Sequence, residues 1–209
     1  MTQAAPTGRD GSDDDPFAAI GDPHLAVTDR RRALLAVAGA HEYDEAKTVG
    51  VLDVTGGPRR RLLLTSQFPV HAMAFHPHHP LLAVGTGDYD GGYHFEGELL
   101  LLHLETREVR SLIGPDFGFG RQVLALEWLN HQDLRVLMAP LDDWEDAAAH
   151  REGHVAVVHR PDWSAVGAGS LTSRDLAGPR VPAPRPDHRE AARQSVARLT
   201  APRVRHRHT

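Results

Sequence analysis

Carboxylates, aromatic rings and imidazoles gather at three places in this sequence, and these are the side chains best suited to chemistry or recognition. The three acidic-aromatic clusters are Glu42-Tyr43-Asp44-Glu45, Asp88-Tyr89-Asp90 and Asp143-Trp144-Glu145-Asp146. A histidine stands close to each cluster, at His41, His94 and His150. Groups of these types can bind a basic partner, coordinate a divalent cation or simply be solvated.

Three interpretations of the clusters remain open. They can be charged hairpin tips in water, with each ring packed against a neighbouring structural unit. They can instead form an acidic face that recognises a basic or peptide-like protein partner through exposed rings. Its candidate binding residues are Tyr43, Asp44, Asp88, Tyr89, Asp90, Asp143, Trp144 and Glu145.

A divalent-metal site is the third interpretation, with His94, Asp88 and Asp90 as weak candidate ligands. Their spacing fixes no coordination geometry, so neither a metal nor any other cofactor is predicted. The chain has no cysteine, which excludes disulfides and thiolate catalysis. It also lacks a nucleophile elbow, a P-loop and an H-E-x-x-H motif, and these absences favour a non-catalytic protein.

Each cluster lies between two apolar runs of strand length. The first runs begin at Leu34, Leu81 and Leu134, which are 47 and 53 positions apart. Repetition at roughly 40–50 residues with several strands per unit is typical of propeller blades. The loops that carry the clusters run roughly 10–15 residues, longer than tight hairpins, and we expect all three at one rim of the protein.

The pattern predicts four strands in each of three units. The expected strands are 24–27, 34–38, 49–54 and 61–64, then 72–75, 81–85, 98–104 and 108–112, then 123–128, 134–138, 154–158 and 163–166. Strand alternation predicts a core that contains Phe75, Leu82, Val84, Leu100, Leu102, Leu126 and Trp128.

Residues 74–88, which read AFHPHHPLLAVGTGD, resemble the first half of a WD-type β-propeller repeat. An apolar-Phe-x-Pro turn there precedes a Leu-Ala-x-Gly strand. Leu52-Asp53 resembles the Trp-Asp dipeptide that closes the third strand, and Leu102-His103 and Val158-His159 occupy the same position. The chain therefore resembles a divergent WD-type repeat protein, which implies four-stranded blades over about residues 20–166.

The fold class expected is all-β: a partial, three-blade β-propeller-like array of four-stranded antiparallel sheets, with disordered termini and one short C-terminal helix. The expected segments are a disordered leader at 1–16, repeats at 17–166 and a Pro/Arg-rich tail at 167–209. The repeat units span about 20–66, 67–119 and 120–166, and the helix about 187–199, with Asp187 as its N-cap.

Three blades are too few to close a ring, since propellers typically have 4–8. The chain can be a part of a larger propeller, a truncated product, or a homo-oligomer that closes the propeller with other copies. The turn at His76, His78 and His79 is expected to point these side chains outward, because Pro77 and Pro80 fix it. His103 and His159 are expected to be hydrogen-bonded strand-end residues.

Charge and hydropathy limit the partners. The net charge is −5, yet residues 171–209 hold nine Arg against three acidic residues. This tail lacks interleaved aromatics, so nucleic-acid binding is not expected. No apolar run approaches the roughly 18 residues of a membrane span, and no secretory signal is visible, so a cytoplasmic location without membrane contact is expected.

The sequence thus predicts a non-catalytic protein-interaction module, or propeller fragment, that presents an acidic and aromatic loop face to an unidentified protein partner. The alternative is a metal-dependent propeller hydrolase of the lactonase kind, which would use carboxylates and histidines of the same loops. The two differ in convergence, because metal ligands must meet at one point whereas an interface spreads its residues.

Overall fold

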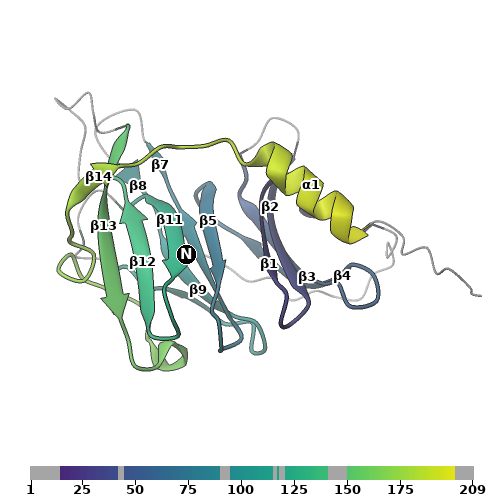
Figure 1. The fold of residues 1–209 in the computed structure, drawn as a ribbon, viewed down its shortest axis with the longest axis horizontal. Helices are drawn as coiled ribbons and strands as arrows, with labels where there is room; N and C mark the ends of the chain where they lie inside the picture. The colour runs from purple at the N-terminus through teal and green to yellow at the C-terminus, as the bar shows by residue number, and fades with distance from the viewer. Residues whose placement is uncertain are drawn as a thin grey trace, which may run out of the picture.

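A computed structural model describes residues 15–41, 45–89, 95–114, 117, 121–140 and 150–200, with only the backbone of Thr200. Its strands form three four-stranded antiparallel sheets and one small hairpin (Figure 1). The all-β prediction is therefore confirmed. In the described part of the chain, no helix is long and apolar enough to cross a membrane.

Each large sheet is a meander in chain order. The first contains β1 (Asp22–Asp29), β2 (Leu34–Ala40), β3 (Thr48–Asp53) and β4 (Arg59–Thr65). The second contains β5 (Val70–Phe75), β6 (Leu81–Thr86), β9 (Leu99–His103) and β10 (Val109–Ser111). The third contains β11 (Val123–Trp128), β12 (Asp133–Met138), β13 (Glu152–His159) and β14 (Arg180–Pro182).

The three sheets stack face to face, as blades of a propeller do. The first strand of the second sheet, β5, contacts both β1 and β11, so the first strands of all sheets lie side by side. Alternate side chains explain the stacking: Ala36 and Ala38 of β2 face the second sheet, while Leu35 and Val37 belong to a separate cluster on the other face. The three four-stranded antiparallel sheets expected from the sequence are therefore present, stacked in chain order.

The predicted core agrees with the burial of the side chains. Leu82, Val84, Leu100 and Leu102 are all 0% exposed and pack between the first and second sheets. The other three predicted residues are partly buried: Phe75 packs against the same cluster, and Leu126 and Trp128 pack between the second and third sheets.

The fourth strand of the third sheet was predicted wrongly. Residues 163–166 form instead the short 3₁₀ helix η2 (Trp163–Ala165), in which Trp163 is 0% exposed. The indole Nε1 of Trp163 donates to the Gln132 carbonyl oxygen at 2.8 Å. The place of the fourth strand is taken by β14, which pairs with the beginning of β13. A three-residue strand with proline at its end leaves almost no strand signal in the sequence.

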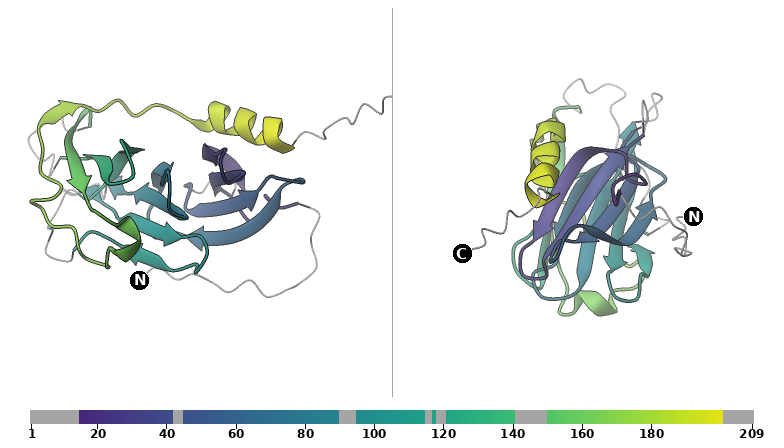
Figure 2. Two further views of the ribbon diagram at one scale, coloured as in Figure 1. Left: turned by 60° about the horizontal axis from the view of Figure 1, so that its bottom comes forward. Right: turned by 90° about the vertical axis from the view of Figure 1, so that its right-hand side faces the viewer.

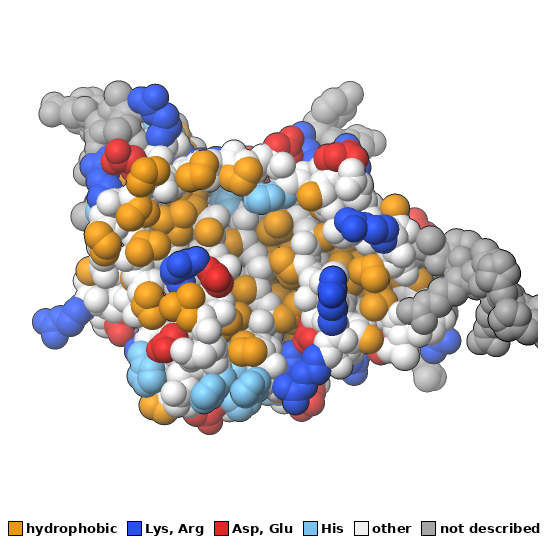
Figure 3. Space-filling view, in the orientation of Figure 1, with side chains coloured by type: hydrophobic (Ala, Val, Ile, Leu, Met, Phe, Trp, Pro, Cys, Tyr) orange, Lys and Arg blue, Asp and Glu red, His pale blue; other side chains and the backbone are white. Residues whose placement is uncertain are grey.

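Histidine side chains gather at one end of the molecule (Figure 3), and there the expectation of an outward His76 is wrong. His76 is 0% exposed. Its Nδ1 accepts the backbone N–H groups of His78 and His79, at 3.1 and 2.8 Å. Its Nε2 donates to the His131 carbonyl oxygen at 2.9 Å, and the Trp128 ring lies edge-on at 4.5 Å.

Equivalent strand-end positions in the three sheets bear hydrogen-bonded polar residues, as expected for His103 and His159. Asp53 at the end of β3 accepts the Thr55 N–H at 2.9 Å. His103 at the end of β9 accepts the Thr106 N–H at 3.3 Å through Nδ1. His159 at the end of β13 has its Nδ1 2.7 Å from the Asp133 carboxylate.

After β14 the chain returns to the first sheet. Residues 183–188, called the strap from here on, run past the first strands to α1 (Arg189–Thr200), which packs on β1 (Figure 2). Ala192 is buried, and Val196 packs against the cluster of Leu35 and Val37. The Arg193 guanidinium pairs with both carboxylate oxygens of Asp22, at 3.1 and 2.5 Å. The predicted C-terminal helix is confirmed.

The start of α1 differs in detail from the prediction that Asp187 is its N-cap. The first helical hydrogen bond runs from the Ala192 N–H to the His188 carbonyl, so His188 occupies the N-cap position. Asp187 stands one residue earlier and accepts the Arg189 N–H at 2.9 Å. Glu190 accepts a hydrogen bond from the Gln194 side chain.

Candidate functional site

Most of the predicted binding residues fall outside the described part of the chain. These are Tyr43, Asp44, Asp90, Asp143, Trp144 and Glu145, together with the weak metal candidate His94. Asp88 and Tyr89 are described, as are the ends of all three loops. We call the described loop ends the rim: Glu45, Asp88, Tyr89, Phe95, Glu96 and His150.

The second loop begins and ends as a small two-stranded hairpin. β7 (Asp88–Tyr89) pairs with β8 (Phe95–Glu96), and Tyr89 lies opposite Phe95. The rings of Tyr89 and Phe95 are 5.0 Å apart between centroids. The hairpin follows β6 and leads into β9, and its Phe95 is buried.

Tyr89 also joins the second loop to the third. Its ring meets that of His150 edge-on, with centroids 5.0 Å apart, and Phe95 lies 5.4 Å from the same imidazole. Tyr89 is half-buried and Phe95 is buried. Two of the three loops therefore do meet at one rim. The ring of Tyr89 thus packs against a neighbouring structural unit, as the first interpretation of the clusters expects.

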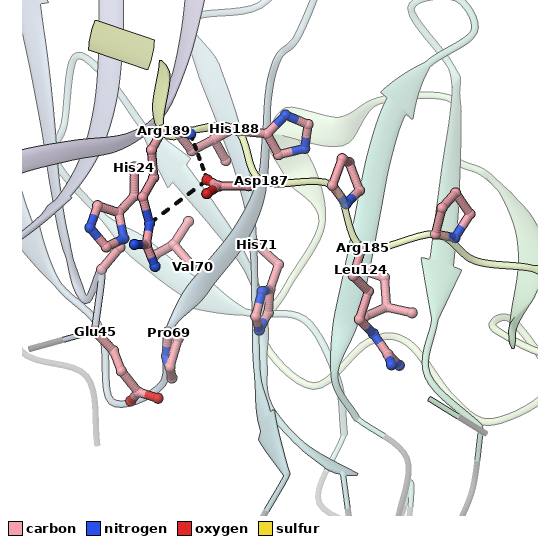
Figure 4. Close-up of a pocket in the computed structure, with 14 residues that line it drawn as sticks. His24, Glu45, Pro69, Val70, His71, Leu124, Arg185, Asp187, His188 and Arg189 are labelled. Carbon is pink, nitrogen blue, oxygen red and sulfur yellow. Dashed lines mark hydrogen bonds and ion pairs between the residues drawn. The ribbon is translucent and has the colours of Figure 1, made fainter. Parts of the chain in front are cut away.

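A cavity of about 490 Å³ lies beside the rim, where the first strands of the three sheets converge beneath the strap (Figure 4). His24 and Leu25 come from β1, Val70 and His71 from β5, and Leu124 from β11. The strap and the start of α1 cover the cavity with residues 184–189, and Glu45 of the rim contributes an acidic side chain.

His71 stands at the centre of this cavity wall. Its Nε2 lies 2.7 Å from the Gly87 carbonyl oxygen, and the Gln122 amide nitrogen lies 3.1 Å from the same atom. Burial lowers the pKa of the His71 imidazole, and the hydrogen bond to Gly87 opposes this shift. The carboxylates of Asp88 and Glu45 also oppose it, so these two of the rim's acidic residues act on the cavity.

The strap and the start of α1 supply the guanidinium groups of the cavity. Arg185 donates to the His150 carbonyl oxygen, and its guanidinium lies 5.7 Å from the centre of the Phe95 ring. Burial lowers the pKa of this guanidinium. Arg189, on the other side of His71 in Figure 4, lies near His24 and helps to lower the pKa of that imidazole, after the larger effect of burial.

Metal binding has no support within the described residues. They contain no group of three or more histidines and carboxylates that could hold a metal ion. Asp90 and His94 lie outside the described residues, so the metal site proposed with Asp88 stays a hypothesis. The described cavity combines imidazoles, guanidinium groups and two carboxylates, which suits the recognition of charged and hydrogen-bonding groups.

The fold and the rim define the class: an all-β protein of three stacked, propeller-like sheets whose loop ends meet beside a cavity. Comparison of the sequence with protein-family models and with curated proteins finds no match. Sequence reasoning missed the strap as part of the site, although its Pro-Arg-Pro sequence at 184–186 was visible as an extended segment. No sequence signal links this segment to His71 or Phe95.

Proposed function

We propose that this chain is a non-catalytic protein-interaction module of the divergent WD type, which binds an extended basic segment of a protein partner at its acidic and aromatic rim. One observation carries the proposal. The chain's own strap crosses the rim in an extended conformation and lays Arg185 over Phe95.

The chemistry of the rim supports a basic partner. A guanidinium over an aromatic face contributes about 0.5–2 kcal/mol, and more when water is excluded. Nearby carboxylates such as Asp88 and Glu45 raise the local concentration of cations. An extended proline-containing segment loses little conformational entropy on binding, since it is already extended. A partner with these properties would compete with Arg185 for the same surface.

The experiment measures the fluorescence anisotropy of a labelled peptide, Pro-Arg-Val-Pro-Ala-Pro-Arg-Pro, on titration with the full chain. The Arg185→Ala variant is expected to bind the peptide about tenfold more tightly, because the internal competitor is weakened. Affinity should fall as salt is added, since exposed charges are screened. A peptide with both arginines replaced by glutamate is the control and should not bind.

A triple variant tests the rings themselves. Replacing Tyr43, Tyr89 and Trp144 by alanine should abolish peptide binding while the variant stays folded, with a melting temperature lowered only by the lost packing of Tyr89. Unchanged peptide binding by the triple variant would contradict the proposal. Loss of the folded state would instead assign these rings to packing between sheets.

A further inference from the structure

The two outer faces of the three-sheet stack differ in how far other segments of the chain cover them. On the first sheet, Leu35, Val37 and Leu52 are all 0% exposed, although none of the sheets in the described part of the chain lies against them. Ile20 packs on this face, together with Phe17 from the preceding turn and Val196 from α1. The chain therefore covers the outer face of its first sheet with its own segments.

Among the described residues, no segment covers the outer face of the third sheet in this way. The strand registers align its side chains in two rows, Ala125–Leu137–Val155 and Glu127–Arg135–Val157. Val157 is 53% exposed, Ala125 is exposed, and Leu137 and Val155 are half-buried. Val181 and Pro182 of β14 border a shallow cavity of about 280 Å³ on this face.

Figure 3 shows the consequence at the surface. Hydrophobic side chains gather over the part of the molecule where β11, β12 and β13 lie, around one adjacent pair of opposite charges. Glu127 and Arg135 are ion-paired across β11 and β12. Apart from this pair, the two central rows are apolar, as expected for a sheet face that packs against another sheet.

We propose that a second copy of this chain covers the outer face of the third sheet, sheet against sheet, about a two-fold axis. Two features favour a second copy over another protein. The sheets of this chain already stack through apolar faces, so another sheet with an apolar face is a fitting cover for this one. The face is also self-complementary in charge, because a two-fold axis places Glu127 of one copy against Arg135 of the other, twice.

In the proposed dimer, Glu127 and Arg135 of each copy would pair with Arg135 and Glu127 of the other copy. Within one copy the Glu127–Arg135 pair is about half exposed, and such pairs add little stability. Between two copies, the same charges would be shielded from water by Val157, Leu137 and Val155, which makes their arrangement specific for orientation. The dimer face shares no residue with the rim, so the inference does not depend on the proposed function.

The test measures the mass of the full chain by light scattering and sedimentation velocity over a wide range of concentration. The 22.9 kDa chain is expected to double its mass as concentration rises. Val157→Arg should keep the mass at 22.9 kDa at every concentration. Leu199→Arg changes an exposed leucine on α1 instead, and it should dimerise like the unmodified chain. Melting curves check that each variant is folded.

Charge exchange tests the two-fold arrangement itself. Glu127→Arg and Arg135→Glu each place like charges opposite one another, so each variant alone should be monomeric. An equimolar mixture of the two should form heterodimers, because both reciprocal contacts are then between opposite charges. A monomeric unmodified chain, a dimeric Val157→Arg variant, or a mixture that stays monomeric would each overturn the proposal. Capture of a different protein by this face, without self-association, would overturn it as well.

Discussion

The Nε2 atom of His76 donates to the backbone carbonyl of His131 at 2.9 Å and so joins the turn after β5 to the turn after β11. Because Nδ1 of the same ring accepts two backbone N–H groups, the neutral imidazole is held in one tautomer. Arg32, at the end of the β1–β2 turn, donates to the His76 and His79 carbonyl oxygens, at 3.0 and 2.5 Å. The buried His76 ring and the Arg32 guanidinium together thus connect turns of all three sheets.

The stability of the protein should depend on pH through this ring. Burial lowers the pKa of His76 from 6.5 to about 4. Below about pH 6.5 the unfolded chain binds a proton at this histidine and the folded chain does not, so stability decreases as pH falls toward 4. The loss should reach about 3 kcal/mol, the free energy that corresponds to this shift.

Urea unfolding between pH 4 and 7 measures this dependence. His71 and His24, whose pKa values are also lowered by burial, act in the same direction. Asp175 acts only at lower pH, because hydrogen bonds from Arg160 and Thr172 outweigh its burial and hold its pKa at about 2. His76→Asn should show a shallower dependence than His103→Asn, which changes a half-exposed imidazole in a similar turn. Equal slopes in the two variants would rule out His76 as the main source.

The docking of α1 on the first sheet should depend on Ala192. Ala192 is 2% exposed, whereas its neighbour Ala191 is exposed. Ala192→Glu would bury a charge against β1, so the helix should detach, and an isolated helix of this length is marginal in water. Hydrogen exchange of residues 189–200 should accelerate strongly in Ala192→Glu and remain slow in Ala191→Glu. Equal protection in the two variants would show that α1 does not depend on this contact.

The interface between the first and second sheets should respond to truncation according to burial. Leu82→Ala should destabilise the fold by about 2–5 kcal/mol, because it leaves a cavity at a fully buried position. Phe75→Ala should cost less than the loss of a fully buried phenylalanine, about 3–5 kcal/mol, because Phe75 is only half-buried. Equilibrium unfolding in urea gives both values. A loss for Phe75→Ala at or above that of a fully buried phenylalanine would contradict the burial argument.

Close approach of the N-terminal turn to β2 requires glycine at position 39. A Cβ atom built on Gly39 would lie 2.5 Å from the Ile20 carbonyl oxygen. Gly39→Ala should therefore cost about 1–3 kcal/mol through overpacking. Gly56, in the β3–β4 turn, has no atom within 4 Å of such a Cβ and is the matched control. Its alanine variant should change the free energy of unfolding by less than about 0.5 kcal/mol.

The local residue pattern was sufficient to predict the strands in which polar and apolar residues alternate, and those with five or more consecutive apolar residues. The segments 34–38 and 134–138 were predicted within a few residues, because strand periodicity depends only on neighbouring side chains. The strand β14 was missed and Trp163 was placed in a strand. The indole of Trp163 is held by Gln132 and packs against Trp128, 35 positions earlier, so its conformation is decided by distant partners.

The candidate site shows the same division. The sequence alone determined that three acidic-aromatic loops separate strand pairs, because residue type and spacing are written directly in it. Only the tertiary structure decided that His76 is buried, that the strap lays Arg185 over Phe95, and that one outer sheet face is covered while the other is open. The physical reason is that burial and charge contacts depend on which surfaces meet after folding, and those surfaces come from segments far apart in the chain.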